Sequence, residues 1–263
     1  MVSAKQIQSN LDEIRSRIDA ACKRSNRNPD SVTLIAVSKM NPAEAVIAAA
    51  DAGQYIFGEN RVQELRSKQD EIGSYSMDGN EVVSTFLNDS REGISTFSKD
   101  GRELEWHLIG HLQTNKVKDA VGNVVLIHSV DSLKLAEAIS KESIKKGITS
   151  DILLEVNISN EESKFGLSPD QAGIVAAEIS KLPNVKIRGL MTVAPYTENP
   201  ETNRIYFKKL KDLSVDISSK NIDNISMDVL SMGMTGDFEV AIEEGATHVR
   251  VGTGIFGARD YSH

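Results

Sequence analysis

Short apolar runs alternate with amphipathic segments along most of the chain. The runs are rich in β-branched residues, as expected for strands that are covered on both faces. They lie at residues 33–38, 54–58, 105–112, 123–130, 151–157, 185–193, 225–232 and 248–256. Segments with helical periodicity lie between most of them, at residues 42–52, 60–72, 114–121, 132–146, 168–181, 200–218 and 236–244. Eight strands that alternate with helices predict a parallel sheet.

A further amphipathic helix precedes the first apolar run. Its apolar positions recur at the spacing of one helix face, at Ile7, Leu11, Ile14, Ile18 and Ala21. With 263 residues, the whole pattern favours a single (β/α)8 barrel of the TIM type with an N-terminal helix, forming one α/β domain over residues 1–263. An open doubly wound sheet is the alternative architecture. Such sheets more often carry an early glycine-rich phosphate turn, and none follows the first apolar run here.

Residues 74–103 do not follow the alternation. This stretch is polar, contains several glycines and has no periodicity. Because irregular segments of a compact domain lie on its surface, we interpret 74–103 as a surface loop inserted between the second helix of the alternating pattern and the third strand. A mobile loop without a site of its own is the simplest interpretation.

The composition narrows the classes of function. A formal net charge of −8 argues against sequence-independent nucleic-acid binding, which needs a strongly basic surface. The single cysteine, Cys22, precludes an internal disulfide and is typical of a reducing compartment. No run of about 18 apolar residues predicts a membrane span, and the N-terminus lacks the apolar segment of a secretory signal. We therefore expect a cytoplasmic protein that binds neither nucleic acid nor membrane, with a nuclear or mitochondrial pool left open.

Candidate chemistry lies where the predicted strands end, because the active groups of such barrels gather at the C-terminal ends of their strands. Lys39 follows the first apolar run and Asn60 follows the second. A lysine at that place is either a solvated strand end or an amine that takes part in chemistry.

The ends of the seventh and eighth runs carry small residues, in SMGMTGD (231–237) and GTG (252–254). Backbone N–H groups can approach an anion closely in such segments, and the loops after strands seven and eight are the usual phosphate site of this architecture. Asp237 and Glu239 would repel a phosphate at the start of the next helix, so we place the anion on the loop before it and on Gly252–Thr253. Ordinary glycine-rich turns are the alternative.

An amine and a phosphate site on neighbouring strands of a closed barrel suggest a Schiff base with a phosphorylated aldehyde. Pyridoxal phosphate and a sugar-phosphate aldehyde both satisfy this pattern. The residues alone do not separate the two.

Six segments of the chain, taken together, resemble one known family. They occur in order between Val32 and Gly257 and read IAVSK, FGENRVQE, WHLIGHLQTNK, SKFGL, GLMTVAP and LSMGMTGDFEVAIEEGATHVRVGTGIFG. The resemblance is to the pyridoxal phosphate homeostasis protein family, whose fold is similar to the barrel domain of alanine racemase. It implies pyridoxal 5′-phosphate as the cofactor and a role in intracellular vitamin B6 and amino-acid homeostasis, as carrier or regulator.

The resemblance also implies roles for individual residues. Lys39 matches the lysine that holds the cofactor as a Schiff base, and it is the one residue assigned a catalytic role. Ser231, Gly252 and Thr253 match phosphate-binding positions.

Five further positions complete this predicted cofactor site. Backbone groups of Met232 and Gly233 are expected to assist at the phosphate. Arg250 matches the arginine that faces the pyridine nitrogen, and Asn60 and Met191 match positions that line the cofactor ring.

Arg250 limits the chemistry that such a site can perform. Because arginine stays protonated, it would leave an adjacent pyridine nitrogen unprotonated and disfavour carbanion chemistry. Read without Lys39, Arg250 would be interpreted as part of a structural salt bridge. Racemisation also needs a second acid/base, which alanine racemase takes from an extra domain of its partner subunit, and this sequence shows no such group. We therefore expect little or no catalysis and, by default, a monomer.

The histidines do not predict a metal site. His107 and His111 are four residues apart, which on a strand corresponds to about 13 Å, so their imidazoles cannot share one ion. We interpret His107 and His128 as core or strand-end residues. His111 belongs to a family-like segment, but no role can be assigned to it.

Three functions therefore remain open. The first is a protein that binds pyridoxal phosphate on Lys39 and serves as carrier or regulator. The second is an amino-acid racemase of low activity that uses the same cofactor, and the third is an aldolase-like barrel that forms a Schiff base with a sugar phosphate. Under the first two, the expected partners are small molecules: pyridoxal phosphate and, as a further candidate, amino acids.

Overall fold

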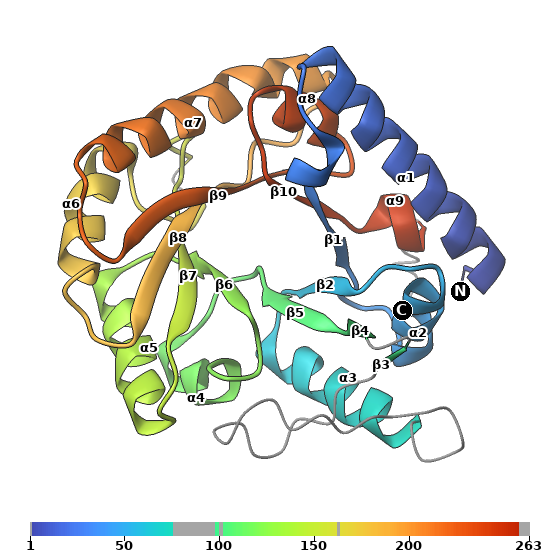
Figure 1. Cartoon of the computed structure of the whole chain (residues 1–263), viewed down its shortest axis with the longest axis horizontal. Coiled ribbons are helices and arrows are strands. Elements are labelled where there is room, and N and C mark those ends of the chain that lie inside the picture. The colour runs from blue at the N-terminus through green and yellow to red at the C-terminus, as the bar shows by residue number, and fades with distance from the viewer. Residues whose placement is uncertain (1, 76–97, 100–101, 162–163, 258–263) are drawn as a thin grey trace.

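The chain folds into a closed ring of eight parallel strands surrounded by helices (Figure 1). The computed structural model describes residues 2–75, 98–99, 102–161 and 164–257. The ring is closed by β1 pairing with both β10 and β2, so the predicted (β/α)8 barrel is confirmed over the open alternative. In ring order the strands are β1 (Thr33–Val37), β10 (His248–Val251), β9 (Ile225–Met234), β8 (Val185–Met191), β7 (Ser150–Glu155), β6 (Leu126–Val130), β5 (Glu105–Leu108) and β2 (Ile56–Glu59).

The helices form the outer layer and follow the strands in the predicted order. They are α1 (Ala4–Arg24), α2 (Ala43–Asp51), α3 (Val62–Tyr75), α4 (Val117–Ala120), α5 (Leu133–Lys145), α6 (Pro169–Ile179), α7 (Arg204–Ser219), α8 (Phe238–Glu243) and α9 (Thr253–Phe256). Short 3-10 turns precede the first strand and two of the helices: η1 (Pro29–Ser31), η3 (Thr114–Lys116) and η4 (Pro200–Asn203). None of the helices in the described part of the chain has the length and apolar character of a membrane span.

Most strands are somewhat shorter than the predicted runs, and two of them, the third and the eighth, are shorter by four residues or more. The third ends at Leu108, because Gly110 passes so close to the backbone of Asn60 that a Cβ there would lie 2.5 Å from its carbonyl oxygen. The chain therefore leaves the ladder before His111. The eighth ends at Val251, and the rest of that apolar run forms α9.

The predicted insertion at 74–103 lies largely outside the described residues. Ser74 and Tyr75 belong to α3. At the other end, β3 (Ser98–Lys99) pairs with β4 (Arg102–Glu103) as two antiparallel strands. Residues 76–97 are not described, so the interpretation of 1–263 as one domain with a surface insertion stays a prediction.

Two apolar layers hold the fold together. The larger one lies between the strands and the helices and includes the apolar face of α1. The smaller one consists of Leu126, Leu153 and Met191, with Val229 packed against them. Buried polar side chains also lie inside the ring and include His107, His128, Ser231 and Arg250.

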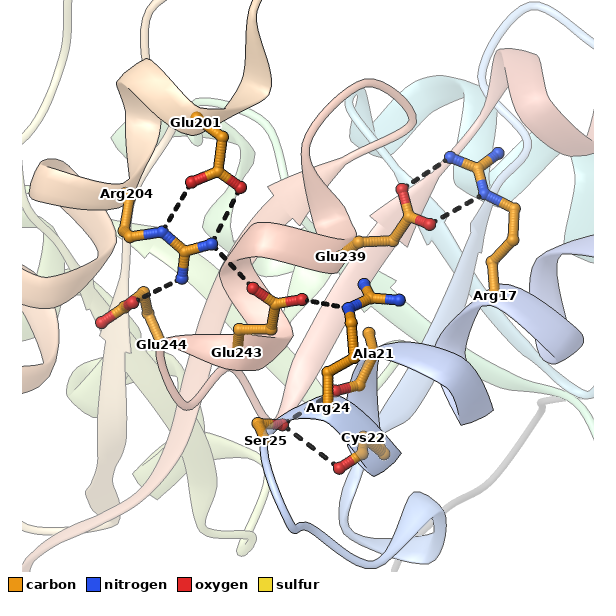
Figure 2. Close-up of polar contacts among 10 residues, drawn as sticks. All are labelled: Arg17, Ala21, Cys22, Arg24, Ser25, Glu201, Arg204, Glu239, Glu243 and Glu244. Atoms are coloured by element: carbon orange, nitrogen blue, oxygen red, sulfur yellow. Dashed lines mark hydrogen bonds and ion pairs between the residues drawn. The ribbon is translucent and has the colours of Figure 1, made fainter.

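Charged pairs fix α8 between α1 and α7 (Figure 2). Arg17 and Arg24 on α1 reach Glu239 and Glu243 on α8 at 2.9 and 2.6 Å. Glu243 is shared with Arg204 at the start of α7, 2.7 Å away. A shared carboxylate forms a network, which places the helix more firmly than isolated surface pairs would. This matters for function, because α8 directly follows one of the two loops of small residues.

Candidate functional site

A cavity of about 560 Å³ opens at the C-terminal end of the barrel. It is lined by residues that follow β1, β2, β5, β8, β9 and β10, which is where the sequence placed the chemistry. Its lining comprises Val37, Lys39, Asn60, Ile109, Val193, Pro195, Tyr196, Thr197, Asn203, Met234, Thr235, Gly236, Asp237, Arg250, Gly252 and Thr253.

Five of the nine predicted site residues share this cavity. They come from three separate parts of the chain and are Lys39, Asn60, Arg250, Gly252 and Thr253. The fold therefore brings the predicted amine, the predicted guanidinium and one predicted phosphate segment to the same space.

The other four predicted residues lie elsewhere. Met191 is fully buried in the inner apolar cluster and Met232 in the outer one. Gly233 faces α8, and the hydroxyl of Ser231 takes part in a buried polar chain. None of the four lines the cavity, and their assignment to a cofactor stays a prediction.

Arg250 brings a buried positive charge to the cavity. Its guanidinium donates to Ser231 Oγ at 2.5 Å and to the carbonyl oxygen of Thr192 at 2.8 Å. Burial lowers its pKa to about 10, while Asp237 and Glu155 act in the opposite direction, so it remains protonated at neutral pH. No described carboxylate forms an ion pair with it, so the geometry does not favour the salt-bridge interpretation.

The hydrogen bonds of Arg250 continue across the barrel to two histidines. His128 Nδ1 lies 2.9 Å from Ser231 Oγ, and His128 Nε2 lies 2.8 Å from His107 Nδ1. The guanidinium can only donate, so Ser231 Oγ accepts from it. Among the described residues, His128 Nδ1 is the acceptor within reach of the buried Ser231 hydroxyl, so the arrangement that satisfies this hydroxyl has Ser231 donating to His128 Nδ1. His128 then carries its proton on Nε2 and donates to His107. Donation thus runs in one direction, from Arg250 to His107.

These two histidines are neutral, and so is His248, whose ring lies beside both of them. Burial lowers the pKa of His107 to about 3 and that of His248 to about 4, and it holds the pKa of His128 well below its usual value. A neutral His128 keeps Nδ1 free to accept from Ser231, so burial maintains the direction of the chain. In the part of the chain that the structure describes, no group of three or more His, Cys, Asp or Glu is arranged to hold a metal ion.

Thr235 connects the two loops of small residues. Its Oγ1 accepts hydrogen bonds from the amides of Gly252 and Gly254, at 3.3 and 3.4 Å. Both distances are long for N–H···O bonds, which cluster near 2.9 Å, so the two amides retain capacity for a stronger acceptor. The sequence pattern names Thr235 as one of several small residues, but the family resemblance assigns the phosphate to Ser231 instead.

Asp237 is less of an obstacle to an anion than its position suggests. Its carboxylate accepts from the Met234 amide at 2.7 Å and from Asn203 Nδ2 at 2.8 Å. Glu239, the other acidic residue in this turn, pairs with Arg17 on α1. Both charges are therefore engaged with donors of this protein.

Several lining residues have no signal in the sequence. Tyr196 and Thr197 lie in the irregular segment after β8, and Asn203 lies in the turn η4. Their presence at the cavity depends on the path of a loop, which no periodicity describes. His111 is not among the lining residues: it pairs with Asp131 at 3.2 Å and stacks on Phe165.

Comparison with known proteins now bears on this geometry. Residues 9–260 match the family model for the alanine racemase N-terminal domain. A protein of Aquifex aeolicus named pyridoxal phosphate homeostasis protein is 42% identical over 251 residues, which covers 95% of this chain and 97% of that protein. The chain belongs to the pyridoxal phosphate homeostasis protein family. The resemblance noted in the six sequence segments is thereby confirmed.

Solved structures extend the likeness of this family member to the fold. A crystal structure of a Bifidobacterium adolescentis protein superposes with a TM-score of 0.83 at 35% identity, over 97% of this chain and 98% of that one. PipY of Synechococcus elongatus, solved with PLP bound, has a TM-score of 0.74 at 34% identity, over 95% of this chain and all of that one. This pyridoxal phosphate homeostasis family member thus shares its fold with these relatives over 95–97% of its length.

Proposed function

We propose that this chain binds pyridoxal 5′-phosphate in the cavity at the barrel mouth, joined to Lys39 as a Schiff base. In this proposal the protein acts as a monomeric, cytoplasmic carrier or regulator of the cofactor. The supporting observation is that Lys39, Arg250 and the Thr235–Gly252 loops line one cavity. The relative PipY, which was solved with PLP bound, and the name of the family also support binding of pyridoxal phosphate.

The donor set of the cavity fits this cofactor. A phosphate needs several N–H and O–H donors, and the amides of Gly252 and Gly254 and the hydroxyl of Thr235 converge at one wall. A Cβ at Gly252 would meet the carbonyl oxygen of Val37 at 3.3 Å, so a glycine lets this segment pack closely against the end of β1, the strand that precedes Lys39. We therefore assign the phosphate to Thr235, Gly252 and Thr253.

The remaining roles follow from the side chains. The aldehyde of the bound cofactor condenses with a primary amine and releases water, and Lys39 supplies that amine. Arg250 would present a permanent hydrogen-bond donor to the ring nitrogen, and near neutral pH the guanidinium keeps its proton. We expect the site to favour capture and release of the cofactor over reactions that build up carbanion charge. Amino acids are candidate partners because their amines can compete with Lys39.

The test is a spectroscopic titration of the purified protein with pyridoxal phosphate. We expect the absorbance of a Schiff base in the wild-type protein and its absence in Lys39→Ala. Borohydride reduction followed by peptide mass mapping should place the adduct on Lys39. Lys134→Ala, which removes an exposed lysine of α5, is the matched control and should behave like the wild type.

The outcome also separates the alternative functions. Adduct formation with a sugar-phosphate aldehyde but not with pyridoxal phosphate would contradict the proposal and favour an aldolase-like enzyme. Exchange of the Cα hydrogen of alanine in deuterated water, lost in Lys39→Ala, would favour the racemase. An adduct that maps to another lysine would contradict the assignment of Lys39.

A further inference from the structure

Lys68 is a buried lysine beside the segment that carries Lys39. It lies on α3 with 4% of its surface exposed. Its Nζ donates to the carbonyl oxygen of Ser38 at 2.7 Å, to Glu59 Oε1 at 2.5 Å and to Glu64 Oε1 at 2.7 Å. Since an ammonium has three donors, all of its hydrogen-bonding capacity is used by these acceptors.

The acceptors of Lys68 hold both neighbours of Lys39. On one side is Ser38. Its hydroxyl donates to Glu59 Oε1 at 2.7 Å, and its backbone carbonyl oxygen accepts the hydrogen bond from Lys68. On the other side, the backbone amide of Met40 donates to Glu64 Oε1. One ammonium therefore connects, through two carboxylates, the residues that precede and follow Lys39.

The backbone at this point needs such support. Met40 has φ +62°, in the left-handed region that non-glycine residues enter at a cost of about 1–2 kcal/mol. A residue stays in that region only when its surroundings fix it. The hydrogen bond from the Met40 amide to Glu64 helps to hold this backbone conformation, and Lys68 in turn donates to Glu64.

Stability alone does not account for this arrangement. A buried ion network contributes little net stability compared with apolar side chains of the same size, because its charges must be removed from water. Burial indeed raises the pKa of Glu59, which reflects the free-energy cost of removing its charge from water, and the nearby Lys68 acts against that shift. What such a network does provide is a fixed geometry for the backbone groups that it binds.

We propose that Lys68, through Glu59 and Glu64, is a positioning residue for Lys39 that holds its backbone so that the amine projects into the cavity. This inference rests on the proposed function of Lys39. Lys68 does not line the cavity and is not expected to touch the cofactor.

The test compares two ligands on the variant Lys68→Met. Pyridoxal phosphate reports the covalent step, and pyridoxamine phosphate, which carries an amine in place of the aldehyde, reports non-covalent binding only. We expect the rate of adduct formation to fall about tenfold to a hundredfold, as for a reacting group that is misplaced by about 1 Å. The affinity for pyridoxamine phosphate should change less than about twofold, because Lys68 does not line the cavity and its hydrogen bonds go to Ser38, Glu59 and Glu64 rather than to the phosphate loops.

Two variants serve as controls for Lys68→Met. Lys68→Arg keeps the charge and the donors, so it should recover part of the rate. Lys146→Met removes another partly buried lysine, which donates to the carbonyl oxygens of Lys118 and Val121 at 2.7 Å, and it should leave the rate unchanged. An unchanged rate in Lys68→Met, or an equal loss for both ligands, would refute the positioning role.

Two further measurements keep the inference testable. If Lys68→Met does not fold, Glu64→Ala removes the acceptor of the Met40 amide from a partly exposed side chain and should slow the adduct in the same way. The unloaded protein can also be acetylated at limiting reagent and mapped by mass. There, Lys68→Met should alter the labelling of Lys39 several-fold relative to the exposed Lys5, and no change would refute the proposal.

Adduct formation in the wild-type protein separates failure of the proposed function from failure of the positioning role. If the wild-type protein forms no adduct with pyridoxal phosphate, the proposed function fails, whatever Lys68 does. If the adduct forms on Lys39 but Lys68→Met changes neither its rate nor the labelling, the function stands and only the positioning role fails.

Discussion

At the scale of single residues, two hydroxyls near the cavity have different partners. Ser231 is fully buried and lies between Arg250 and His128. Thr235 lines the cavity and accepts from two glycine amides. A hydroxyl that is already engaged with a guanidinium and an imidazole inside the barrel is poorly placed to serve a phosphate at the mouth.

This difference predicts opposite behaviour of two variants. Thr235→Ala should weaken the binding of pyridoxamine phosphate about tenfold to a hundredfold, as for the loss of one hydrogen bond to a charged group. It should leave the affinity for pyridoxamine nearly unchanged. Ser231→Ala should weaken neither ligand selectively but should destabilise the protein by about 1–3 kcal/mol, because buried polar groups lose a partner. Ligand titration and urea unfolding measure the two effects.

Ser143→Ala provides the control for that pair. Its hydroxyl is also buried and lies 2.8 Å from Ser150 Oγ, away from the cavity. It should lower stability without changing either affinity. If Ser231→Ala selectively weakened the phosphorylated ligand, the family-based assignment of Ser231 to the phosphate would be restored.

At the scale of elements, the site depends on the contact between β9 and α8. Gly233 has φ +88°, and a Cβ at this position would lie 2.6 Å from Ala241 Cβ and 2.8 Å from Phe238 Cα. The strand and the helix therefore touch backbone to backbone, directly beneath the loop that carries Thr235. The charged pairs of Figure 2 hold α8 from its other side.

Gly233→Ala should separate these two elements. The expected loss is about 1 kcal/mol for the left-handed backbone plus at least about 2 kcal/mol for the displaced contact with α8. Gly147→Ala is the matched control, since Gly147 has φ +65° and nothing lies within 4 Å of an added Cβ. Urea unfolding of the two variants gives the difference, and equal losses would show that the close contact is unimportant.

In Gly233→Ala, the loop that carries Thr235 should be displaced together with α8. Because Thr235 lies two residues beyond Gly233, its displacement in Gly233→Ala should also weaken pyridoxamine phosphate, whereas Gly147→Ala should not. A destabilised variant with unaltered affinity would mean that the loop is positioned independently of α8.

At the scale of the whole molecule, the barrel interior is unusually rich in titratable groups. Besides the neutral histidines and Arg250, Glu155 at the end of β7 has an unpartnered, buried Oε2. Burial and the charge of Asp131 raise its pKa to about 7, while Arg250 acts in the opposite direction. The folded protein therefore binds a proton here at pH values where the unfolded chain does not.

The sign of the pH dependence follows from this uptake. Between pH 4.5 and about 7 the folded state holds more protons than the unfolded state, so this residue's contribution to stability falls as the pH rises. The shift corresponds to about 3 kcal/mol when complete. Glu155→Gln should thus gain stability over the wild type as the pH rises from 5 to 8, approaching a constant difference near the top of that range.

Urea unfolding at several pH values measures the difference. Glu178→Gln, which removes an exposed glutamate of α6, is the control for the loss of one negative charge. A difference between Glu155→Gln and the wild type that stays constant with pH would show that Glu155 is ionised throughout.

The regular parts of the molecule could be predicted because they repeat. Apolar runs and amphipathic segments report strand and helix directly, since burial on a sheet or a helix face follows a fixed period. The N-terminal helix with Ile7, Leu11, Ile14 and Ile18 buried is an example. Strand ends were less certain, as at His111, because they depend on how closely a neighbouring backbone approaches.

The site could be predicted only in part for a related reason. Lys39 and Gly252 follow strands of the barrel and Arg250 lies near the end of one, and this architecture places strand ends at one mouth. Ser231 and Thr235 are both small hydroxyl residues of one segment. The sequence does not show which of the two side chains is buried inside the barrel and which one lines the cavity at its mouth. Lys68 gave no signal, because two of its acceptors, Ser38 and Glu59, lie outside its helix, and the i,i+4 pair with Glu64 is by itself typical of an exposed helix face.

The sequence by itself determined the kind of fold, the family and the end of the barrel at which the chemistry lies, because each is encoded in local periodicity or in contiguous segments. The tertiary structure alone decided which hydroxyl lines the cavity, which way the hydrogen bonds run from Arg250 to His107, and which buried cation holds the neighbours of Lys39. These depend on distances between residues far apart in the chain. Such distances exist only once the ring of strands has closed.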